Sequence, residues 1–567
     1  MGQFPKGVVL ILATVQGVLL TLLYRAVELK VWPSTEPAWL VALVTLVISL
    51  PLLVFFCIDK DNVKQTLRYV LPFSVLLSLI GAYIGWQQEP VALVHNGNVI
   101  AVFVLTSLIA SFKALMYLQQ YMSQQQISYG QLFTLSWRNF IIFTESVLFV
   151  AVFWGILLLG AGLFAIVGID IFKSLLTKDW FVIPTLTLAF AFANIIFRSI
   201  VTSADTIAAI VETLLKFLLP ALAFISLAFL FTLPFTGLAP LWNTGSGSLL
   251  IMWLQALTLF FVNAVYQGND EHQPYPIFLH RLVFVSVAVL PIYSIVAAYG
   301  LWLRVSQYGL TVDRCWAWLI WALLAMFSFA YLIGIVKKRD AWLGMSSKVN
   351  VVMGLVVLLV MLLVNTPLMN FQSWSVASQL NRLEQGKVSY QDFDYQYVGR
   401  SLGRQGYVAM QALKTTLVDK APDKVVIIER MYVNQRQQEA FSQQEFLQHV
   451  TFWPNKTAFP EALISTVYDK TITHSWSTYR GHNYYFIAQD LNGDDAPEYV
   501  VIDEVNDVTS ANLWRLDNDA WQPFYMNTSN PEQIRYLKGV VTNGDIAVVK
   551  PKWHDLQVGS VLFKVRQ

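Results

Sequence analysis

The chain has 567 residues, of which 56% are hydrophobic and only 13% are charged, and its formal net charge is +2. Soluble domains carry about 25% charged residues, and a charge at the bilayer centre costs about 2.5–3.5 kcal/mol, so this composition indicates a membrane protein. The charge balance gives no support for nucleic-acid binding, which needs a clustered basic face. Cys57 and Cys315 both fall in or beside apolar blocks, and no Cys or His stands near them at metal-ligand spacing.

Apolar blocks follow one another up to Pro367, and beyond it no apolar run is long enough to cross a bilayer. A spanning helix needs about 20 mostly apolar residues. The sequence predicts eleven spans: Gly7–Leu23, Ala38–Ile58, Tyr69–Trp86, Val99–Leu118, Asn139–Val167, Trp180–Phe197, Phe217–Phe235, Ser248–Tyr266, Ile277–Trp302, Cys315–Val336 and Val349–Leu368. The block that starts at Asn139 is the longest. It contains Gly155, Gly160 and Gly162, and a break there would invert the topology of everything downstream.

Lys and Arg in the short loops set the orientation of a polytopic protein, because the cytoplasmic side carries the excess. With the N-terminus inside, thirteen Lys and Arg fall on the inner side, Lys113 and the group Lys337–Arg339 among them, and six fall on the outer side. An odd number of spans then places the C-terminal domain outside. We therefore expect a multi-pass protein of a bacterial inner membrane, with a cytoplasmic N-terminus and a periplasmic C-terminal domain.

Ionisable residues within the spans are the usual markers of function in membrane proteins, and here they are scarce. Glu145 is the clearest, and it fits either a proton or cation site or an ion pair with Arg138. The sequence contains no Walker loop, H-E-x-x-H, G-x-S-x-G or Rossmann fingerprint. Polytopic sugar transferases need an acidic residue in the first outer loop, where this chain has Glu28 and Glu36.

Several distinctive short segments lie before and after the last two spans. Tyr299–Arg314 (YGLWLRVSQYGLTVDR) precedes the tenth span, and Asn365–Pro367, Ser375–Leu383 (SVASQLNRL), Asp392–Tyr395 (DFDY) and Gly403–Gly406 (GRQG) follow the last span. These segments resemble the bacterial membrane-protein family catalogued as domain of unknown function 4153, over roughly residues 1–420. The resemblance implies an inner-membrane protein without an assigned activity, and it brings no catalytic residues.

Tyr308–Thr311, at the centre of this pattern, predicts a turn. Gly309 permits a positive φ, and Thr311 can cap the next helix through its hydroxyl. Arg304 and Arg314 are expected at the membrane edge, where arginines snorkel or contact lipid phosphate. Two interpretations stay open for these arginines: a topological anchor, or a contact for a lipid headgroup or a phosphate-bearing substrate.

After Pro367 the pattern predicts helices first and strands later. Val376, Leu380 and Leu383 form an apolar stripe that predicts a helix ending at Gly386, and a second helix is expected over Tyr397–Leu417. Lys424–Arg430 is a candidate strand, and Ser442 with Glu445 forms a capping box for a helix over Ser442–Val450. Further strands are expected at Tyr484–Gln489, Tyr499–Asp503, Asn512–Leu516, Trp521–Tyr525, Asp545–Val549 and Val561–Val565.

The predicted fold is a polytopic α-helical membrane bundle of about eleven spans with a C-terminal soluble α+β domain that ends in an antiparallel sheet. The expected boundaries are 1–368 for the transmembrane helical domain, 369–420 for a helical junction and 421–567 for the soluble domain.

One loop of the soluble domain has the composition of a metal site. Asp490, Asn492, Asp494 and Glu498 place oxygen side chains at relative positions 1, 3, 5 and 9, and Gly493 lets the loop fold tightly. The loop is similar to the Asp-x-Asn-Gly-Asp loops of calcium-binding β-repeat proteins, but it departs from an EF-hand in the position of its Gly and in lacking a Glu at position 12. It equally fits a plain hairpin turn. Calcium is the only cofactor that the sequence suggests.

Three functions follow from these observations. The first is a non-enzymatic envelope protein whose soluble domain recognises a protein partner or ligand while the bundle lies in the lipid bilayer. The second is a transporter or flippase for a lipid or a weakly charged substrate. The third, a polytopic membrane transferase, has the least support because its motifs are missing.

Overall fold

The computed structural model describes residues 5–59, 62–91, 93–94, 97–123, 127–243, 245–267, 274–339, 342–432, 443–474, 482–505, 508–517, 520–526, 537–548, 556–558 and 561–563. The chain divides into two compact units, Met1–Tyr432 and Val433–Gln567. Each unit has hydrophobic clusters of its own. The division falls twelve residues after the end expected for the helical junction, so all the helices that directly follow the last span belong to the first unit.

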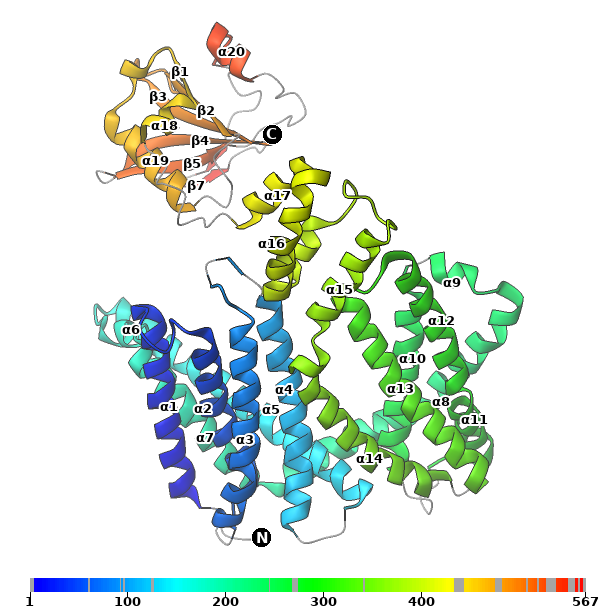
Figure 1. The fold of residues 1–567 in the computed structure, drawn as a ribbon. Helices are drawn as coiled ribbons and strands as arrows, with labels where there is room; N and C mark the ends of the chain where they lie inside the picture. The colour runs from blue at the N-terminus through cyan, green and yellow to red at the C-terminus, as the bar shows by residue number, and fades with distance from the viewer. Residues whose placement is uncertain are drawn as a thin grey trace. The chain divides into compact units, whose positions relative to one another are not determined.

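Eleven spans in the described part of the chain are long and apolar enough to cross a membrane, which confirms the predicted count. Their helices are α1 Lys6–Leu29, α2 Pro37–Cys57, α3 Val63–Trp86, α4 Gly97–Met122, α5 Tyr129–Ile166, α7 Asp179–Ser199, α8 Val201–Thr236, α10 Gly247–Tyr266, α11 Ile277–Ala288 with α12 Leu290–Tyr308, α13 Val312–Lys338 and α14 Trp342–Leu363 (Figure 1). The short helices α6 Ile171–Leu175 and α9 Ala239–Asn243 lie between spans. α11 and α12 together form one span, interrupted at Val289 just before Pro291.

The long block after Asn139 is unbroken, because α5 is a single helix of 38 residues. At 1.5 Å per residue it is about 57 Å long, nearly twice the roughly 30 Å of a bilayer's hydrocarbon core. A Cβ atom added at Gly155, Gly160 or Gly162 would meet no atom within 4 Å. These glycines therefore face open surface, and they neither break the helix nor pack it against a neighbour.

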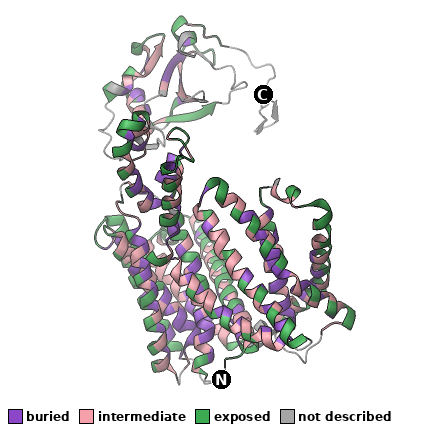
Figure 2. Cartoon of the chain, turned by 45° about the vertical axis from the view of Figure 1, so that its right-hand side comes forward, coloured by how far each residue is buried: buried purple, intermediate pink, exposed green. Residues whose placement is uncertain are grey.

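The membrane helices form two groups with separate cores. The first group, α1–α5 with α7, surrounds a cluster that includes Val9, Phe55 and Ile195. The second, α8 with α10–α14, surrounds a larger cluster that includes Tyr293 and Trp342. Figure 2 shows buried positions on the inward faces of these helices and exposed positions on their outward faces. The outward faces carry many large apolar side chains, as expected of helices that are surrounded by lipid.

The helical junction consists of η2 Pro367–Met369, α15 Phe371–Glu384, the π-helical turn η3 Tyr397–Ser401, α16 Gly403–Lys420 and α17 Pro422–Tyr432. α15 ends before Gly386, whose φ of +67° is the left-handed conformation that stops a helix. The strand predicted at Lys424–Arg430 is wrong, because this segment is helical. Pro422 occupies the first position of α17, and Val425, Ile428 and Met431 recur every three residues in the cluster shared with α16.

The second unit contains a five-stranded mixed sheet with strands in chain order: β1 Val450–Trp453, β2 His482–Gln489, β3 Glu498–Val505, β4 Val508–Asp517 and β5 Ala520–Met526. β2–β5 are antiparallel as predicted. β1 differs, because it pairs in parallel with β2, with Val450 opposite Tyr484. The helices α18 Gln443–Gln448 and α19 Glu461–His474 contribute Phe446, Leu463 and Val467 to a core with the sheet.

Of the other predictions for this unit, one is confirmed in part and one is wrong. α19 was not predicted. Asp545–Val548 are irregular and follow a short helix, α20 Leu537–Asn543, so the strand predicted there is wrong over its described residues. β7 Val561–Phe563 pairs with β6 Leu556–Val558 and confirms part of the last predicted strand. Ser442 of the capping box, Val549 and residues 564–565 lie outside the described residues.

Candidate functional site at the junction

The predicted turn joins α12 to α13 and is held by side chains of the junction. The backbone N–H of Leu310 donates to Ser378 Oγ at 2.9 Å, and that of Val312 donates to Tyr397 Oη at 3.0 Å. Ser375 Oγ donates to the Leu310 carbonyl at 3.2 Å. Gln379 Nε2 donates to the carbonyls of Tyr308 and Leu310 at 3.2 and 2.8 Å. We refer to these five hydrogen bonds as the junction clasp.

Gly309 is the residue that permits this close approach. Its backbone has φ +72° and ψ −178°, a region that only glycine adopts readily. A Cβ at Gly309 would lie 2.6 Å from Cδ of Arg382 and 3.0 Å from Nε2 of Gln379. Thr311 caps α13 by accepting from the N–H of Arg314 at 3.4 Å, as predicted. The two sequence patterns that flank the last two spans thus meet in space.

Two arginines contact this turn and a third lies within electrostatic reach of Arg314; we call Arg304, Arg314 and Arg382 the arginine cluster. Arg314 Nη1 donates to the Gly309 carbonyl at 2.6 Å, and its guanidinium lies 5.4 Å from the centre of the Tyr308 ring. Arg304 Nη2 donates to the Trp242 carbonyl at 3.3 Å. Arg382, on α15, was not singled out from the sequence. Its position was hidden because α15 reaches the turn only through tertiary packing.

A second contact joins the junction to the end of α3. The Arg404 guanidinium stacks on Trp86 at 4.2 Å, donates to the Glu89 carbonyl at 2.9 Å and lies 3.7 Å from the Glu89 carboxylate. Asn370 Nδ2 donates to Tyr83 Oη at 2.8 Å. Tyr83, Asn370 and Arg404 line a cavity of about 20 Å³, which holds roughly one water molecule. The cavity is therefore too small for a headgroup or a sugar.

Gly406 of the Gly403–Gly406 segment has a packing role. A Cβ at Gly406 would lie 1.9 Å from the Val398 carbonyl oxygen, so only glycine allows α16 to start against η3.

Tyr395 donates a hydrogen bond to the Tyr390 carbonyl at 2.8 Å, and burial raises the pKa of Tyr395 to about 12. Tyr395 therefore stays neutral at physiological pH and acts as a hydrogen-bond donor.

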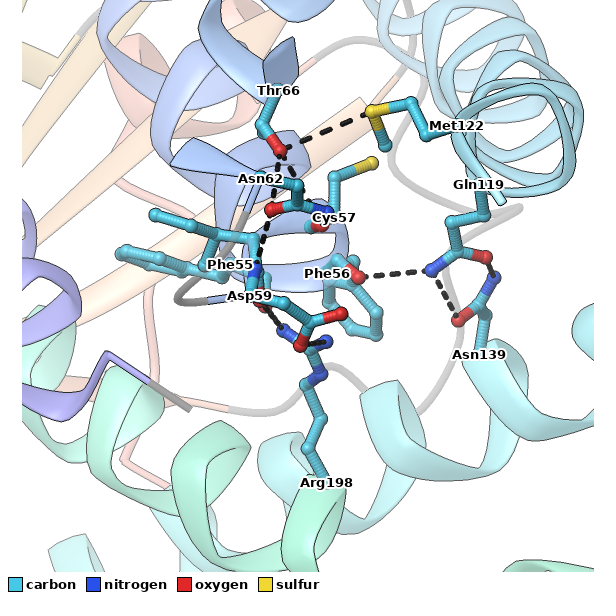
Figure 3. A network of polar contacts seen from close by, with 11 residues as sticks. Phe55, Phe56, Cys57, Asp59, Asn62, Thr66, Gln119, Met122, Asn139 and Arg198 are labelled. Atoms are coloured by element: carbon cyan, nitrogen blue, oxygen red, sulfur yellow. Dashed lines mark hydrogen bonds and ion pairs between the residues drawn. The ribbon is translucent and has the colours of Figure 1, made fainter. Parts of the chain in front are cut away.

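At the end of α2 a further polar network satisfies a helix terminus (Figure 3). Arg198, from α7, donates to the carbonyls of Phe55 and Ile58 at 2.6 and 3.1 Å, and lies 3.4 Å from the Asp59 carboxylate. Gln119 donates to the Phe56 carbonyl at 2.9 Å and exchanges amide hydrogen bonds with Asn139 at 2.8 and 3.3 Å. The last carbonyls of a helix have no partner within it, so this network caps α2.

A larger cavity of about 350 Å³ adjoins this network where α4 ends and α5 begins. Its lining includes the amide side chains of Gln119, Gln120 and Gln131 with the hydroxyls of Ser123 and Thr134. Gln120 donates a hydrogen bond to Gln131. The cavity has the volume of a small-molecule site, and its described lining contains no charged side chain.

A family model described as domain of unknown function (DUF4153) matches residues 35–413, which are 379 of the 567 residues. The chain belongs to this family. The matched residues include the turn, the junction clasp, the arginine cluster and Gly403–Gly406, so the resemblance in the sequence is confirmed. No match was found among curated proteins or among solved structures.

Glu145 lies half-buried on α5, about two turns after Arg138, and both of its interpretations stay open. Two other ionisable groups within the DUF4153 match lie in helices long and apolar enough to cross a membrane. The charge count places Lys113 on the inner side, but Lys113 lies within α4, nine residues before its end. His280 is buried on α11, with Nδ1 3.1 Å from Tyr266 Oη. A lone His or Lys in an apolar block was the available signal. Glu28, which the sequence analysis assigned to the first loop, lies in the last turn of α1 and forms an ion pair with Arg25 at 2.9 Å.

The predicted metal residues lie outside the DUF4153 match, in the loop between β2 and β3. Asp490 accepts from the backbone N–H groups of Gly493, Asn492 and Asp495 at 2.7, 3.2 and 3.0 Å, and these bonds lower the pKa of Asp490. Asn492 Nδ2 donates to Asp494 and Glu498 at 2.9 and 2.7 Å. Among the residues that the structure describes, no group of three or more His, Cys, Asp or Glu is arranged to hold a metal. Calcium binding stays a prediction.

Proposed function

We propose that this integral membrane protein is a non-enzymatic component of a bacterial inner membrane, whose soluble unit Val433–Gln567 recognises a partner or ligand outside the cytoplasm. The proposal takes its orientation from the excess of Lys and Arg on one side of the spans. The observation that carries it is the junction clasp, because it fixes α15 and η3, in the junction that follows the last span, to the α12–α13 turn.

The hydrogen bonds of the clasp are strong enough together to hold the junction against the α12–α13 turn. A hydrogen bond within a protein contributes about 0.5–1.5 kcal/mol, so five such bonds contribute roughly 5 kcal/mol. All five satisfy backbone groups of one turn or hydroxyl and amide groups of the junction. Each of the five joins two groups of the protein itself. This arrangement suits a rigid attachment between membrane helices and junction rather than a catalytic centre.

Cysteine labelling tests the orientation. Cys57 and Cys315 are buried, so an introduced cysteine is the accessible one. Gln385→Cys in the junction is expected to react with a membrane-impermeant maleimide added to intact spheroplasts, whereas Ser123→Cys at the end of α4 is expected to react only after lysis. The reverse pattern would contradict the proposed topology.

Crosslinking and complementation test recognition. Tyr525 on β5 is 69% exposed, and a photo-reactive residue placed there in the full-length protein is expected to give specific adducts in living cells. The double variant Ser378→Ala/Gln379→Ala removes three clasp bonds. It is expected not to complement a strain from which the gene for this protein has been deleted. Gln385→Ala is the matched control, because its amide bonds only to Asn381 on the same helix. Normal complementation by the double variant, or the absence of any adduct, contradicts the proposal.

Transport or flipping of a lipid or weakly charged substrate is the second candidate. The cavity of about 350 Å³ between α4 and α5 favours it, because amides and hydroxyls without a charge suit an uncharged polar substrate. Substituting Gln120 or Thr134 by Leu would then abolish complementation while the double clasp variant remained active. That result would favour transport over recognition.

A further inference from the structure

We propose that the arginine cluster is a binding site for a phosphate group at the membrane edge. Arg304 comes from α12, Arg314 from α13 and Arg382 from α15. Arg314 and Arg382 contact the turn at Gly309, and Arg304 lies within electrostatic reach of Arg314. This inference goes beyond the proposed function, since the site lies in the membrane unit and is independent of what the soluble unit recognises.

The electrostatics of the cluster are unbalanced. Arg304 and Arg382 both lie within electrostatic reach of Arg314, as do the hydroxyls of Tyr397 and Tyr308. The neutral Gly309 carbonyl accepts a hydrogen bond from Arg314 Nη1. In the described part of the chain, every ion pair found lies elsewhere. Three neighbouring guanidinium groups without an ion-pair partner among the described residues repel one another, and a bound anion would reduce that repulsion.

The second observation is an unmet donor. Nε of Arg382 is buried and has no hydrogen-bond partner among the described residues. Its side-chain stem is held against Gly309, since a Cβ there would come within 2.6 Å of Arg382 Cδ. A buried guanidinium donor that lacks an acceptor is costly. An oxygen atom supplied by a ligand would satisfy it, and guanidinium groups match the geometry of phosphate oxygens.

The position of the cluster selects the ligand class. Arg304 is four residues before the end of α12, and Arg314 is the third residue of α13, so both lie near the ends of spans. Lipid phosphates occupy this level of a membrane. α13 also begins here, and its N-terminus adds positive potential to the site. A phosphate can come from a lipid headgroup or from solution, and the test below distinguishes these sources.

The experiment uses the full-length protein and two probes. Nanodiscs of phosphatidylcholine with added phosphatidylglycerol, compared with phosphatidylcholine alone, supply a lipid phosphate diester with net negative charge. Inorganic phosphate added to protein in a neutral detergent supplies the free anion. A rise in unfolding temperature with the anionic lipid alone assigns the site to a headgroup, and a rise with inorganic phosphate assigns it to free phosphate. No rise with either probe overturns the proposal.

Variants locate the binding. Arg382→Gln is expected to weaken binding of whichever probe is active by about tenfold or more, because a hydrogen bond to a charged group is lost. Arg400→Gln is the matched control, since Arg400 is an exposed junction arginine outside the cluster. Equal weakening by both variants would mean non-specific attraction and overturn the site. Should Arg382→Gln not fold, Arg304→Gln gives the same test, because Arg304 bonds to the protein through the Trp242 carbonyl rather than through the clasp.

Discussion

Gly309→Ala probes the junction clasp most sharply, because the chain supplies a matched control. Gly309 and Gly237 end their helices with nearly identical backbones, φ +72° and ψ −178° against φ +71° and ψ −178°. An alanine strains either backbone by about 1–3 kcal/mol. A Cβ at Gly237 would meet nothing within 4 Å, whereas at Gly309 it would lie 2.6, 3.0 and 3.2 Å from Arg382, Gln379 and Ser378. Only Gly309→Ala therefore displaces α15.

The additional cost follows from the hydrogen bonds that the displaced residues make. Ser378 and Gln379 form three of the five clasp bonds. The loss of two or three bonds of about 1 kcal/mol each predicts that Gly309→Ala is more destabilising than Gly237→Ala by roughly 2–3 kcal/mol. The assay is equilibrium unfolding of the full-length protein in mixed micelles titrated with sodium dodecyl sulfate, followed by tryptophan fluorescence. Equal losses of stability in the two variants would refute the clasp as an energetic unit.

Four further predictions concern other regions. Arg198→Ala uncovers the carbonyls of Phe55 and Ile58 and is expected to cost about 2–5 kcal/mol in the same assay, while Arg68→Ala, at an exposed arginine, changes little; similar losses would contradict the capping role. Arg304→Ala is expected to abolish complementation at a normal membrane level, and loss of the protein itself would favour the anchor interpretation. Calcium at several millimolar is expected to raise the unfolding temperature of the full-length protein but not of Asp490→Asn, and no rise would exclude the metal site. The pKa of Asp490 is held below its usual 3.8, so its carboxylate stabilises the loop at neutral pH, and this contribution is lost as the pH falls through the lowered pKa. The stability difference between wild type and Asp490→Asn should therefore shrink below about pH 4. A difference that stays constant with pH would contradict this prediction.

Long apolar blocks could be predicted from the sequence because the bilayer imposes one length and one composition on every span. The eleven spans and the antiparallel strands β2–β5 follow from such local patterns. Lys424–Arg430 could not be assigned, because a short run of Val and Ile fits a buried strand as well as one face of a helix. Its helical state depends on Ile428 packing against α16, which no local pattern contains.

The candidate site divides in the same way. Gly309, Thr311, Arg304 and Arg314 could be identified because a turn between two spans has a local signature. Arg382 could not, because it is 68 residues after Arg314 and joins the cluster only when α15 packs on the turn. The partners of Asn370 and Arg404 at the end of α3 were equally hidden, since about 290 to 320 residues separate them in the chain.

Because the polypeptide is made from its N-terminus, the junction clasp can form only after α15 has been synthesised. Leu310 leaves the ribosome 65 residues before Ser375 and 68 before Ser378, so its backbone waits for partners that do not yet exist. At about 5–20 residues per second this delay is several seconds, during which α13 and α14 must enter the membrane. Water has to solvate the α12–α13 connection in the meantime. Completion of α15 then closes the connection, so a nascent chain stalled before this point would expose it to proteases, and the clasp marks when the last two spans have been correctly inserted.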